Sequence, residues 1–299
     1  MGLYFRAVRG PFVSASLLPV LYGTALARWY GFSISPLRLL LNVLGVVALH
    51  FGANAANDYY DYVFGADPAR AVIKPFSGGS QLLQRGLLQP RHYSWLIGGH
   101  LALASVIALG FGFVAGPIAA ILGLSGIFFG YYYSAPPVKL AYRGWGELAV
   151  GLAFGPLSVA GSFALYGGLP PKEVFAASLP LAFLIANVLY VNQYADYAED
   201  KEADKLNLVV RLGPNRALPG VYALFAAAYA ALIMALVGGY LPLSAAAGTL
   251  TLPLALWAAR RTRQSLQQPD KLAAASLATI IVHAVTGAAL IMTLTCFPR

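Results

Sequence analysis

Charged residues are scarce in this chain of 299 residues, because Asp, Glu, Lys and Arg together make up only 10% of it. Soluble globular proteins carry about 25% charged residues. The shortage excludes an ordinary soluble enzyme, a disordered tail and a typical nucleic-acid-binding protein, so no nucleic-acid partner is expected. Apolar residues make up 59% of the chain and the mean hydropathy is +0.68. The composition predicts a polytopic membrane protein.

Cysteine is almost absent as well, with Cys296 as the single example. One cysteine excludes both a disulfide framework within the chain and a thiolate metal site. Any metal centre must therefore be built from oxygen or nitrogen ligands.

The long apolar runs are what the chain has in abundance. A helix needs about 20 apolar residues to cross the hydrocarbon core of a bilayer. No ten-residue alternation typical of a β-barrel is present. We expect an all-α membrane protein with about nine transmembrane helices in a single domain, 1–299, with a weak hint of a repeat between 1–134 and 147–258. The expected helices are 11–28, 37–56, 94–115, 117–134, 147–168, 174–192, 218–238, 241–258 and 274–297.

The basic residues predict the orientation. Sixteen of the 20 Lys and Arg residues fall on the side that holds the N-terminus and the connections after the second, fourth, sixth and eighth helices. By the positive-inside rule the N-terminus is cytoplasmic and the C-terminus lies outside. Arg6 and Arg9 before an apolar run also fit a signal peptide, but an odd number of helices with a cytoplasmic N-terminus already explains them.

The acidic residues are more unevenly distributed than the basic ones. Ten of the eleven lie on the predicted cytoplasmic side, and most of them form two clusters at helix ends. In the first cluster Asn57 and Asp61 are four residues apart, as are Asn54 and Asp58. If the helix continues through them, each pair lies on one face of it.

The second cluster follows the sixth expected helix. Asn192, Asp196, Asp200 and Asp204 are spaced by four residues, which on a continuous helix makes a ladder of oxygen ligands. Like charges at this spacing destabilise a helix and are costly to hold near a membrane. A bound cation removes both penalties, and oxygen ligands without His or Cys favour Mg²⁺.

Either cluster alone is best explained as solvated charges at a helix end. Two clusters on one side, each beginning with Asn inside an apolar helix, favour a shared binding site. Mg²⁺ is usually held by a few carboxylates plus substrate phosphates, so two ladders around one cavity could hold a diphosphate. Basic residues that could assist are Lys74, Lys139, Arg143, Lys205 and Arg211.

These motifs resemble the two signatures of the UbiA superfamily of intramembrane prenyltransferases. The first is Asn57-Asp58-x-x-Asp61-x-x-x-Gly65-x-Asp67 and the second is Asp196-x-x-x-Asp200-x-x-x-Asp204-Lys205. The segments 132–147 and 208–213 also fit the family. The similarity runs from near Arg9 to about residue 216, and the last three helices match only in hydrophobic character.

The resemblance implies a helical bundle around a central cavity with a cytoplasmic cap. Such enzymes bind an isoprenyl diphosphate through Mg²⁺, ionise it to an allylic cation and alkylate an electron-rich acceptor, often aromatic. Membrane lipid surrounds the bundle, and the active site faces the cytoplasm from the inner cell membrane. By position, the Mg²⁺ and diphosphate ligands would be Asn57, Asp61, Asp196 and Asp200. Supporting substrate contacts would come from Arg9, Asp58, Lys74, Asp67, Arg143, Asn192, Asp204 and Lys205, with Lys139 on the diphosphate and Tyr133 beside the reacting carbon.

The acceptor is the less certain half of the reaction. The Gly65-x-Asp67 variant and the segment 142–147 resemble the menaquinone branch, which prenylates 1,4-dihydroxy-2-naphthoate. Asp204 departs from the family pattern, which has Gly there, and the segment 74–80 is not typical of that branch. A 4-hydroxybenzoate, glycerol-phosphate lipid, haem or chlorin acceptor stays open. A secondary transporter is the alternative from another class, although it should carry charges near the bilayer midplane.

Overall fold

The computed structural model describes residues 2–69, 74–266 and 268–297, and these residues contain helices and connections but no strand. The α-helices are α1 (Leu3–Ala7), α2 (Val13–Trp29), α3 (Pro36–Val63), α4 (Pro90–Ala115), α5 (Pro117–Tyr132), α6 (Gly146–Leu152), α7 (Ser158–Gly167), α8 (Lys172–Ala195), α9 (Tyr197–Glu202), α10 (Leu208–Leu212), α11 (Pro214–Val237), α12 (Leu252–Gln264) and α13 (Ala273–Cys296). Shorter turns are η1 (Gly10–Phe12), η2 (Leu140–Arg143), η4 (Leu243–Thr251) and η5 (Pro269–Leu272), and η3 (Ala153–Leu157) is π-helical.

Proline and glycine set the ends of the long helices. Proline opens α3, α4, α5 and α11, where its fixed φ suits the helix and its missing N–H breaks no hydrogen bond. Gly116 alone separates α4 from α5 and has a φ of +96°. A residue with a Cβ is strained at that φ, so glycine permits this tight reversal.

The expected membrane helices are largely confirmed as helices. Seven helical segments in the described ranges are long and apolar enough to cross a membrane. The fourth expected helix, α5, has 16 residues and is shorter than a usual span. The eighth consists of the 3-10 segment η4 followed by α12. A count of nine spans and a cytoplasmic N-terminus therefore stay predictions.

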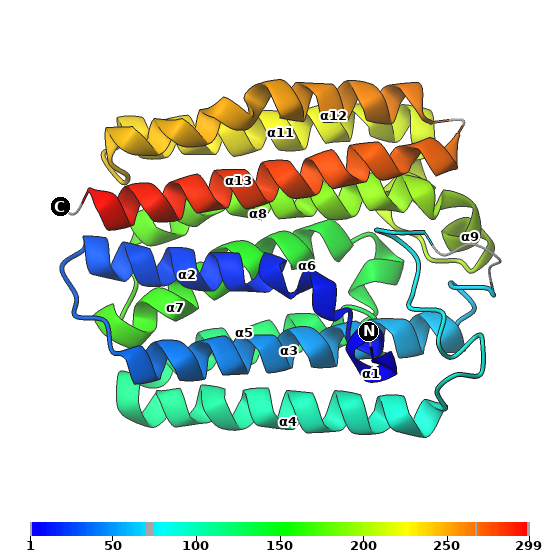
Figure 1. Ribbon diagram of the computed structural model, residues 1–299, viewed down its shortest axis with the longest axis horizontal. Coiled ribbons are helices and arrows are strands. Elements are labelled where there is room, and N and C mark those ends of the chain that lie inside the picture. The colour runs from blue at the N-terminus through cyan, green and yellow to red at the C-terminus, as the bar shows by residue number, and fades with distance from the viewer. Residues whose placement is uncertain (1, 70–73, 267, 298–299) are drawn as a thin grey trace.

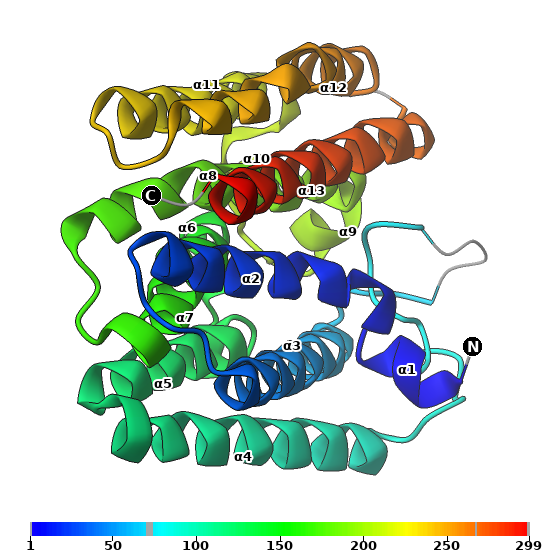
Figure 2. The ribbon, with the colours of Figure 1, turned by 60° about the vertical axis from the view of Figure 1, so that its left-hand side comes forward.

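The long helices lie alongside one another and share two ends (Figure 1). One end carries α1, α9 and the connection from α3 to α4, and the C-terminus lies at the other. Figure 2 shows α11 and α12 along one side of the bundle and α4 along the opposite side, with α2, α8 and α13 between them. The ends of α3 and α8, which carry the two acidic clusters, therefore meet at the same end. We call this end the cap.

Two apolar clusters hold the bundle together. One packs α2, α5, α7 and α13 around Tyr22, Phe163 and Leu290, and the other packs α8, α11, α12 and α13 around Leu184 and Val221. The outer surface is apolar as well: Phe113 is 92% exposed and Val237 is 84% exposed. Such exposed apolar surface is unfavourable in water but suits contact with lipid tails.

The segment from α6 to α7 departs from α-helical geometry at Pro156. Proline has no N–H for the helical ladder, and here the five residues of η3 form a π-helical turn. The Ser158 hydroxyl donates a hydrogen bond of 2.7 Å to the Ala153 carbonyl. Gly155 lies directly against Ala182 of α8, where a Cβ would overlap it. The bulge therefore lets α6 and α8 approach closely below the cap.

Candidate functional site

The first acidic cluster lies on an unbroken helix, as predicted. α3 continues to Val63, so residues four apart share a face. The Asn57 amide donates hydrogen bonds of 2.9 Å to Asp61 Oδ2 and to the Ser134 hydroxyl at the end of α5. Asn54 differs, because its amide donates to the His50 carbonyl of its own helix.

Asp61 connects the first cluster to the segments after α5 and α9. Its side chain is buried, and its Oδ1 accepts a 2.7 Å hydrogen bond from the Tyr142 hydroxyl. Its Oδ2 accepts from Lys205 Nζ at 3.0 Å. Tyr142 follows the loop after α5 and Lys205 follows α9, so Asp61 joins three separate parts of the chain.

The second cluster does not form the predicted continuous ladder. α8 ends at Ala195, Asp196 leaves helical geometry, and α9 begins at Tyr197. Asp204 lies beyond α9 with a φ of +53° and is exposed. The prediction of one continuous helix that carries all four residues of the ladder is wrong, because contacts from elsewhere in the fold hold Asp196 at this break.

Those contacts come from the connection between α3 and α4. The Lys74 ammonium donates to the Ala195 carbonyl, to Asp196 Oδ1 at 3.2 Å and to Glu199 Oε1 at 2.9 Å. The Gly78 amide donates to Asp196 Oδ2 at 3.0 Å. The segment around Gly78 thus lies over the break and links the two acidic clusters through the backbone.

Lys205 links the two clusters through charge. Its ammonium lies 3.0 Å from Asp61 Oδ2 and 3.5 Å from Asp200 Oδ1. Burial alone would lower the pKa of Lys205, but the adjacent Asp200 and Asp61 carboxylates outweigh it and raise the pKa well above its usual value. Asp200 also accepts a 2.8 Å hydrogen bond from the Asn207 amide. One cation is thus shared by carboxylates from the two motifs.

Burial shifts the pKa of two carboxyl groups of the cap. It raises the pKa of Asp200 to about 7, against the opposing effect of Lys205. It also raises the pKa of Asp67 to about 6, with a further rise from the nearby Asp61 charge. Taking a carboxylate out of water disfavours its charged form, so these side chains favour a bound cation or a proton.

Asp58 and Arg9 form a structural tie at the edge of the cluster. Arg9 Nη2 lies 2.9 Å from Asp58 Oδ1. Asp58 Oδ2 accepts from the Ser80 amide at 3.0 Å and from the Tyr93 hydroxyl at 3.2 Å. The carboxylate therefore fastens the chain before α2 and the connection before α4 onto α3.

Other residues expected at the site lie further from the carboxylates. The Lys139 ammonium lies 3.3 Å from the centroid of the Phe64 ring, which is a cation–π contact. Arg143 is exposed and donates to the Pro137 carbonyl at 2.9 Å. Tyr133 packs against Gly146, and burial raises the pKa of its hydroxyl. The charges of Lys205 and Asp61 also act on the Tyr133 hydroxyl.

Sequence reasoning missed several neutral partners of the carboxylates. Tyr142 and Asn207 donate to Asp61 and Asp200, Tyr93 donates to Asp58, and the Ser134 hydroxyl accepts from Asn57. Each reaches the site from a loop or another helix. Tyr142 and Ser134 did lie in the segment 132–147 that fitted the family, but nothing in the spacing pointed to their contacts.

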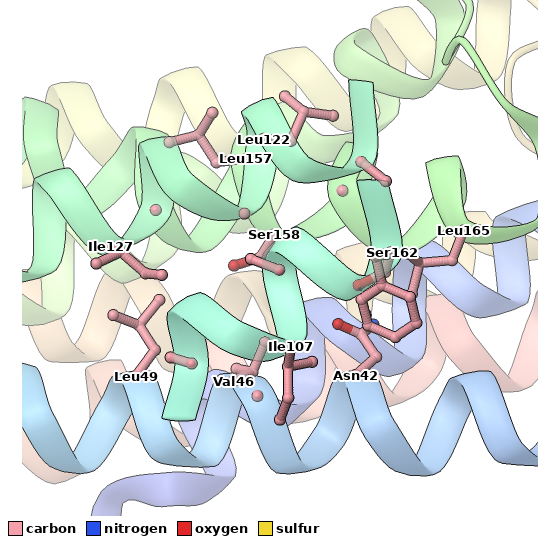
Figure 3. A pocket seen from close by; sticks show the side chains of 18 residues that line it. Asn42, Val46, Leu49, Ile107, Leu122, Ile127, Leu157, Ser158, Ser162 and Leu165 are labelled. Atoms are coloured by element: carbon pink, nitrogen blue, oxygen red, sulfur yellow. Dashed lines mark hydrogen bonds between the residues drawn. The ribbon is translucent and has the colours of Figure 1, made fainter. Parts of the chain in front are cut away.

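A narrow apolar cavity lies deeper in the bundle, between α3, α4, α5 and α7 (Figure 3). Its volume is about 70 Å³, and its polar lining consists of Asn42, Ser158 and Ser162. Asn42 and Leu49 point into it from α3, on a face that continues at four-residue steps to Asn57. At about 1.5 Å per residue, Leu49 lies about 12 Å along the helix from Asn57.

The UbiA prenyltransferase family model matches residues 16–294. The chain belongs to the UbiA prenyltransferase family. The match includes α11, α12 and α13, for which the sequence motifs had indicated only a shared hydrophobic character. Because the family consists of prenyltransferases, this UbiA-family protein is an enzyme rather than a transporter.

Relatives of this UbiA-family protein include enzymes named 1,4-dihydroxy-2-naphthoate octaprenyltransferase. It is 30% identical to the 1,4-dihydroxy-2-naphthoate octaprenyltransferase of Bacillus subtilis (strain 168), over 76% of this chain and 71% of the relative. It is 28% identical to the enzyme of the same name from Mycobacterium leprae (strain TN), over 85% of this chain and 83% of the relative.

Solved structures share the fold of this UbiA-family protein. A UbiA homolog from Aeropyrum pernix K1 aligns with a TM-score of 0.70 at 20% identity, covering 93% of this chain and 97% of that one. A UbiA homolog from Archaeoglobus fulgidus, bound to DMAPP and Mg²⁺, aligns with a TM-score of 0.65 at 20% identity, covering 97% and 99%.

Proposed function

We propose that this protein transfers a polyprenyl group from a Mg²⁺-bound polyprenyl diphosphate to 1,4-dihydroxy-2-naphthoate. The observation that carries the diphosphate half is the cap, where Asp61 of the first motif and Asp200 of the second share one ammonium. Two buried carboxylates that already share one cation can also bind Mg²⁺.

The residues of the cap fit Mg²⁺. Asn57, Asp61, Asp196 and Asp200 supply oxygen donors, which this hard cation prefers. In the described part of the chain, no three acidic, His or Cys side chains converge on one point, and Lys205 and Lys74 occupy the carboxylates in ion pairs. Asn192 Oδ1, one turn before Asp196, is buried without a hydrogen-bond partner among the described residues. That unpaired acceptor supports a bound cation or a hydrogen-bond donor beside Asp196.

Bound Mg²⁺ would neutralise the diphosphate as its bond to the prenyl carbon breaks. The protein's own residues then have three tasks. Asp61 and Asp200 hold the cations, while Lys205 and Lys74 are placed to turn from carboxylate to phosphate oxygens. The Tyr133 ring lies beside the cluster, where an aromatic face can stabilise an allylic cation.

The position of Lys139 makes it a weaker candidate for the diphosphate than Lys205 or Lys74. Its ammonium lies on the Phe64 ring rather than at a carboxylate. We propose that Lys139 contacts the outer phosphate only after leaving Phe64, and that Arg143 stays at the rim.

The acceptor and the compartment rest on other observations. The relatives in B. subtilis and M. leprae are named for 1,4-dihydroxy-2-naphthoate, which supports that acceptor over the alternatives. Basic residues are concentrated in the connections at the cap end, which supports a cytoplasmic active site in the cell membrane. The apolar cavity below Asn57 supports a lipid tail that extends into the bundle.

The decisive assay uses purified protein in detergent with a labelled polyprenyl diphosphate. Acceptors are 1,4-dihydroxy-2-naphthoate and 4-hydroxybenzoate, each with and without Mg²⁺. We expect Mg²⁺-dependent prenylation of the naphthoate alone. Diphosphate release with product from the benzoate only would overturn the acceptor, and no release with any donor length would overturn the donor chemistry.

A further inference from the structure

Glu147 is a buried carboxylate that the diphosphate chemistry does not use. It lies in the first turn of α6 and is 6% exposed. Among the described residues, neither of its oxygens has a hydrogen-bond partner of good geometry. The Gln193 side chain and the Leu208 backbone amide lie near it without closing such a bond.

A second buried acceptor without a partner lies beside Glu147. α6 packs against α8, and on α8 the side-chain oxygen of Gln193, which lies near Glu147, is also buried without a partner in the described chain. The two lysines of the cap point elsewhere, Lys205 to Asp61 and Lys74 to Asp196. Buried acceptors without donors are unfavourable, so this junction between α6 and α8 is complementary to a ligand that donates hydrogen bonds.

The junction is close to the reacting end of the diphosphate site. Tyr133 packs against Gly146, the neighbour of Glu147, with about 3.5 Å between the Tyr133 hydroxyl and the place of a Cβ on Gly146. The charges of Lys205, Glu147 and Asp61 all act on the Tyr133 hydroxyl. Glu147 and the cap carboxylate Asp61 therefore both lie near the Tyr133 hydroxyl.

We propose that Glu147, with Gln193, binds the hydroxyl groups of a hydroxyarene acceptor, and that Glu147 receives the hydroxyl proton during alkylation. This inference rests on the proposed prenyl transfer. The acceptor would lie beside Tyr133 on the side of Glu147, where its ring carbon can reach the prenyl cation.

The proposed alkylation breaks one C–O bond and forms one C–C bond. The prenyl C–O bond breaks and its electron pair leaves with the diphosphate. A π pair of the ring carbon beside the hydroxyl forms the new C–C bond, the O–H pair becomes the second bond of a carbonyl, and the proton passes to the Glu147 carboxylate. The ring carbon then loses its proton to an oxygen of the departing diphosphate, or a carboxylated ring loses CO₂ and keeps the electron pair of the C–C bond. Either loss restores the aromatic ring, and Glu147 returns its proton to the oxygen.

The test compares Glu147→Gln with wild-type protein, using Glu173→Gln at the start of α8 as the matched control. General acid–base catalysis contributes about 10²–10⁴-fold, so we expect E147Q to lower kcat for acceptor prenylation by that range. Mg²⁺-dependent donor binding and the Tm should stay at the wild-type values. An acceptor analogue with a more acidic hydroxyl should lose less activity in E147Q, which a structural role would not produce.

Three outcomes would overturn the inference: turnover of E147Q within threefold of wild type, an equal loss of donor binding and prenylation, or equal losses with all acceptor analogues. Failure of the naphthoate assignment can be distinguished from failure of the role of Glu147. If wild type prenylates a different hydroxyarene and E147Q loses that activity selectively, the role of Glu147 stands and the naphthoate assignment falls.

Discussion

At the scale of single residues, the cap depends on how buried charges are shared. Lys205 lies between Asp61 and Asp200, and their side chains are 15%, 4% and 5% exposed. Removing one partner of a buried ion pair is costly because the other charge stays buried and unpaired. Lys205 therefore balances the charge of two buried carboxylates from different motifs.

Asp61→Ala and Asp200→Ala should each reduce turnover by about 10²–10³-fold or more, because each removes a group that stabilises developing charge on the diphosphate. Both variants should remain folded and inserted in the membrane. Steady-state prenylation and Mg²⁺-dependent donor binding measure the loss. Glu202→Ala, exposed at the end of α9, is the control. Wild-type turnover in both Asp variants would contradict the metal assignment.

Lys205→Met should destabilise the apo protein by about 3 kcal/mol, since it leaves Asp61 and Asp200 buried without their cation. Thermal unfolding in detergent measures the change. Mg²⁺ should recover much of the loss in K205M by taking the place of the ammonium, and it should do less for wild type. A Tm that Mg²⁺ leaves unchanged in K205M would show that the carboxylates do not take the cation.

At the scale of elements, the helices determine how deep in the bundle each part of the site lies, and the connections pack over the site at the cap. α3 runs unbroken from the apolar cavity to Asp61, so one face serves both the apolar and the charged parts of a lipid diphosphate. α8 instead stops at Ala195, and the Gly78 amide and Lys74 hold Asp196 at the break. The first motif is thus built on a rigid helix, and the second depends on a connection packed over it.

Gly161→Leu should select against long donors, because Gly161 lines the cavity and a Cβ there makes only ordinary contact, 3.6 Å from Leu122. We expect kcat/KM for an octaprenyl donor to fall about tenfold relative to a geranyl donor. Gly110→Leu on α4, where a Cβ meets nothing within 4 Å, should leave the ratio unchanged. An unchanged ratio in G161L would place the tail elsewhere.

At the scale of the whole molecule, charge separates the two ends of the bundle. The acidic motifs and most basic residues lie at the cap, while Cys296 ends α13 at the opposite end (Figure 1). The helices between them expose apolar side chains to lipid. A charged head group can therefore react at one membrane face while its tail stays in the bundle.

The orientation can be tested with the single exposed cysteine, Cys296. In intact cells a membrane-impermeant maleimide should label it, because the C-terminus is predicted to lie outside. In a Cys296→Ser background, Glu202→Cys in the cap should react only after permeabilisation. The reverse pattern would mean that the cap faces outward.

Local patterns made much of this protein predictable. Apolar runs of about 20 residues located the long helices, because the bilayer imposes that length. Four-residue spacing placed Asn57 beside Asp61, because both lie on one uninterrupted helix. The same spacing failed after Ala195, since repulsion among nearby carboxylates weakens the helix and contacts from residues 74–80 stabilise a break instead.

The sequence by itself determined the class of the protein, its helices and the carboxylates of both motifs, since hydropathy and helical period are local properties. Only the tertiary structure decided which cation joins Asp61 to Asp200, that Asp204 lies exposed while Asp200 is buried, and that Tyr142 donates to Asp61. It also left Glu147 buried beside a second acceptor without a partner. These outcomes depend on which side chains from distant segments come into contact, and burial determines how strongly their charges interact.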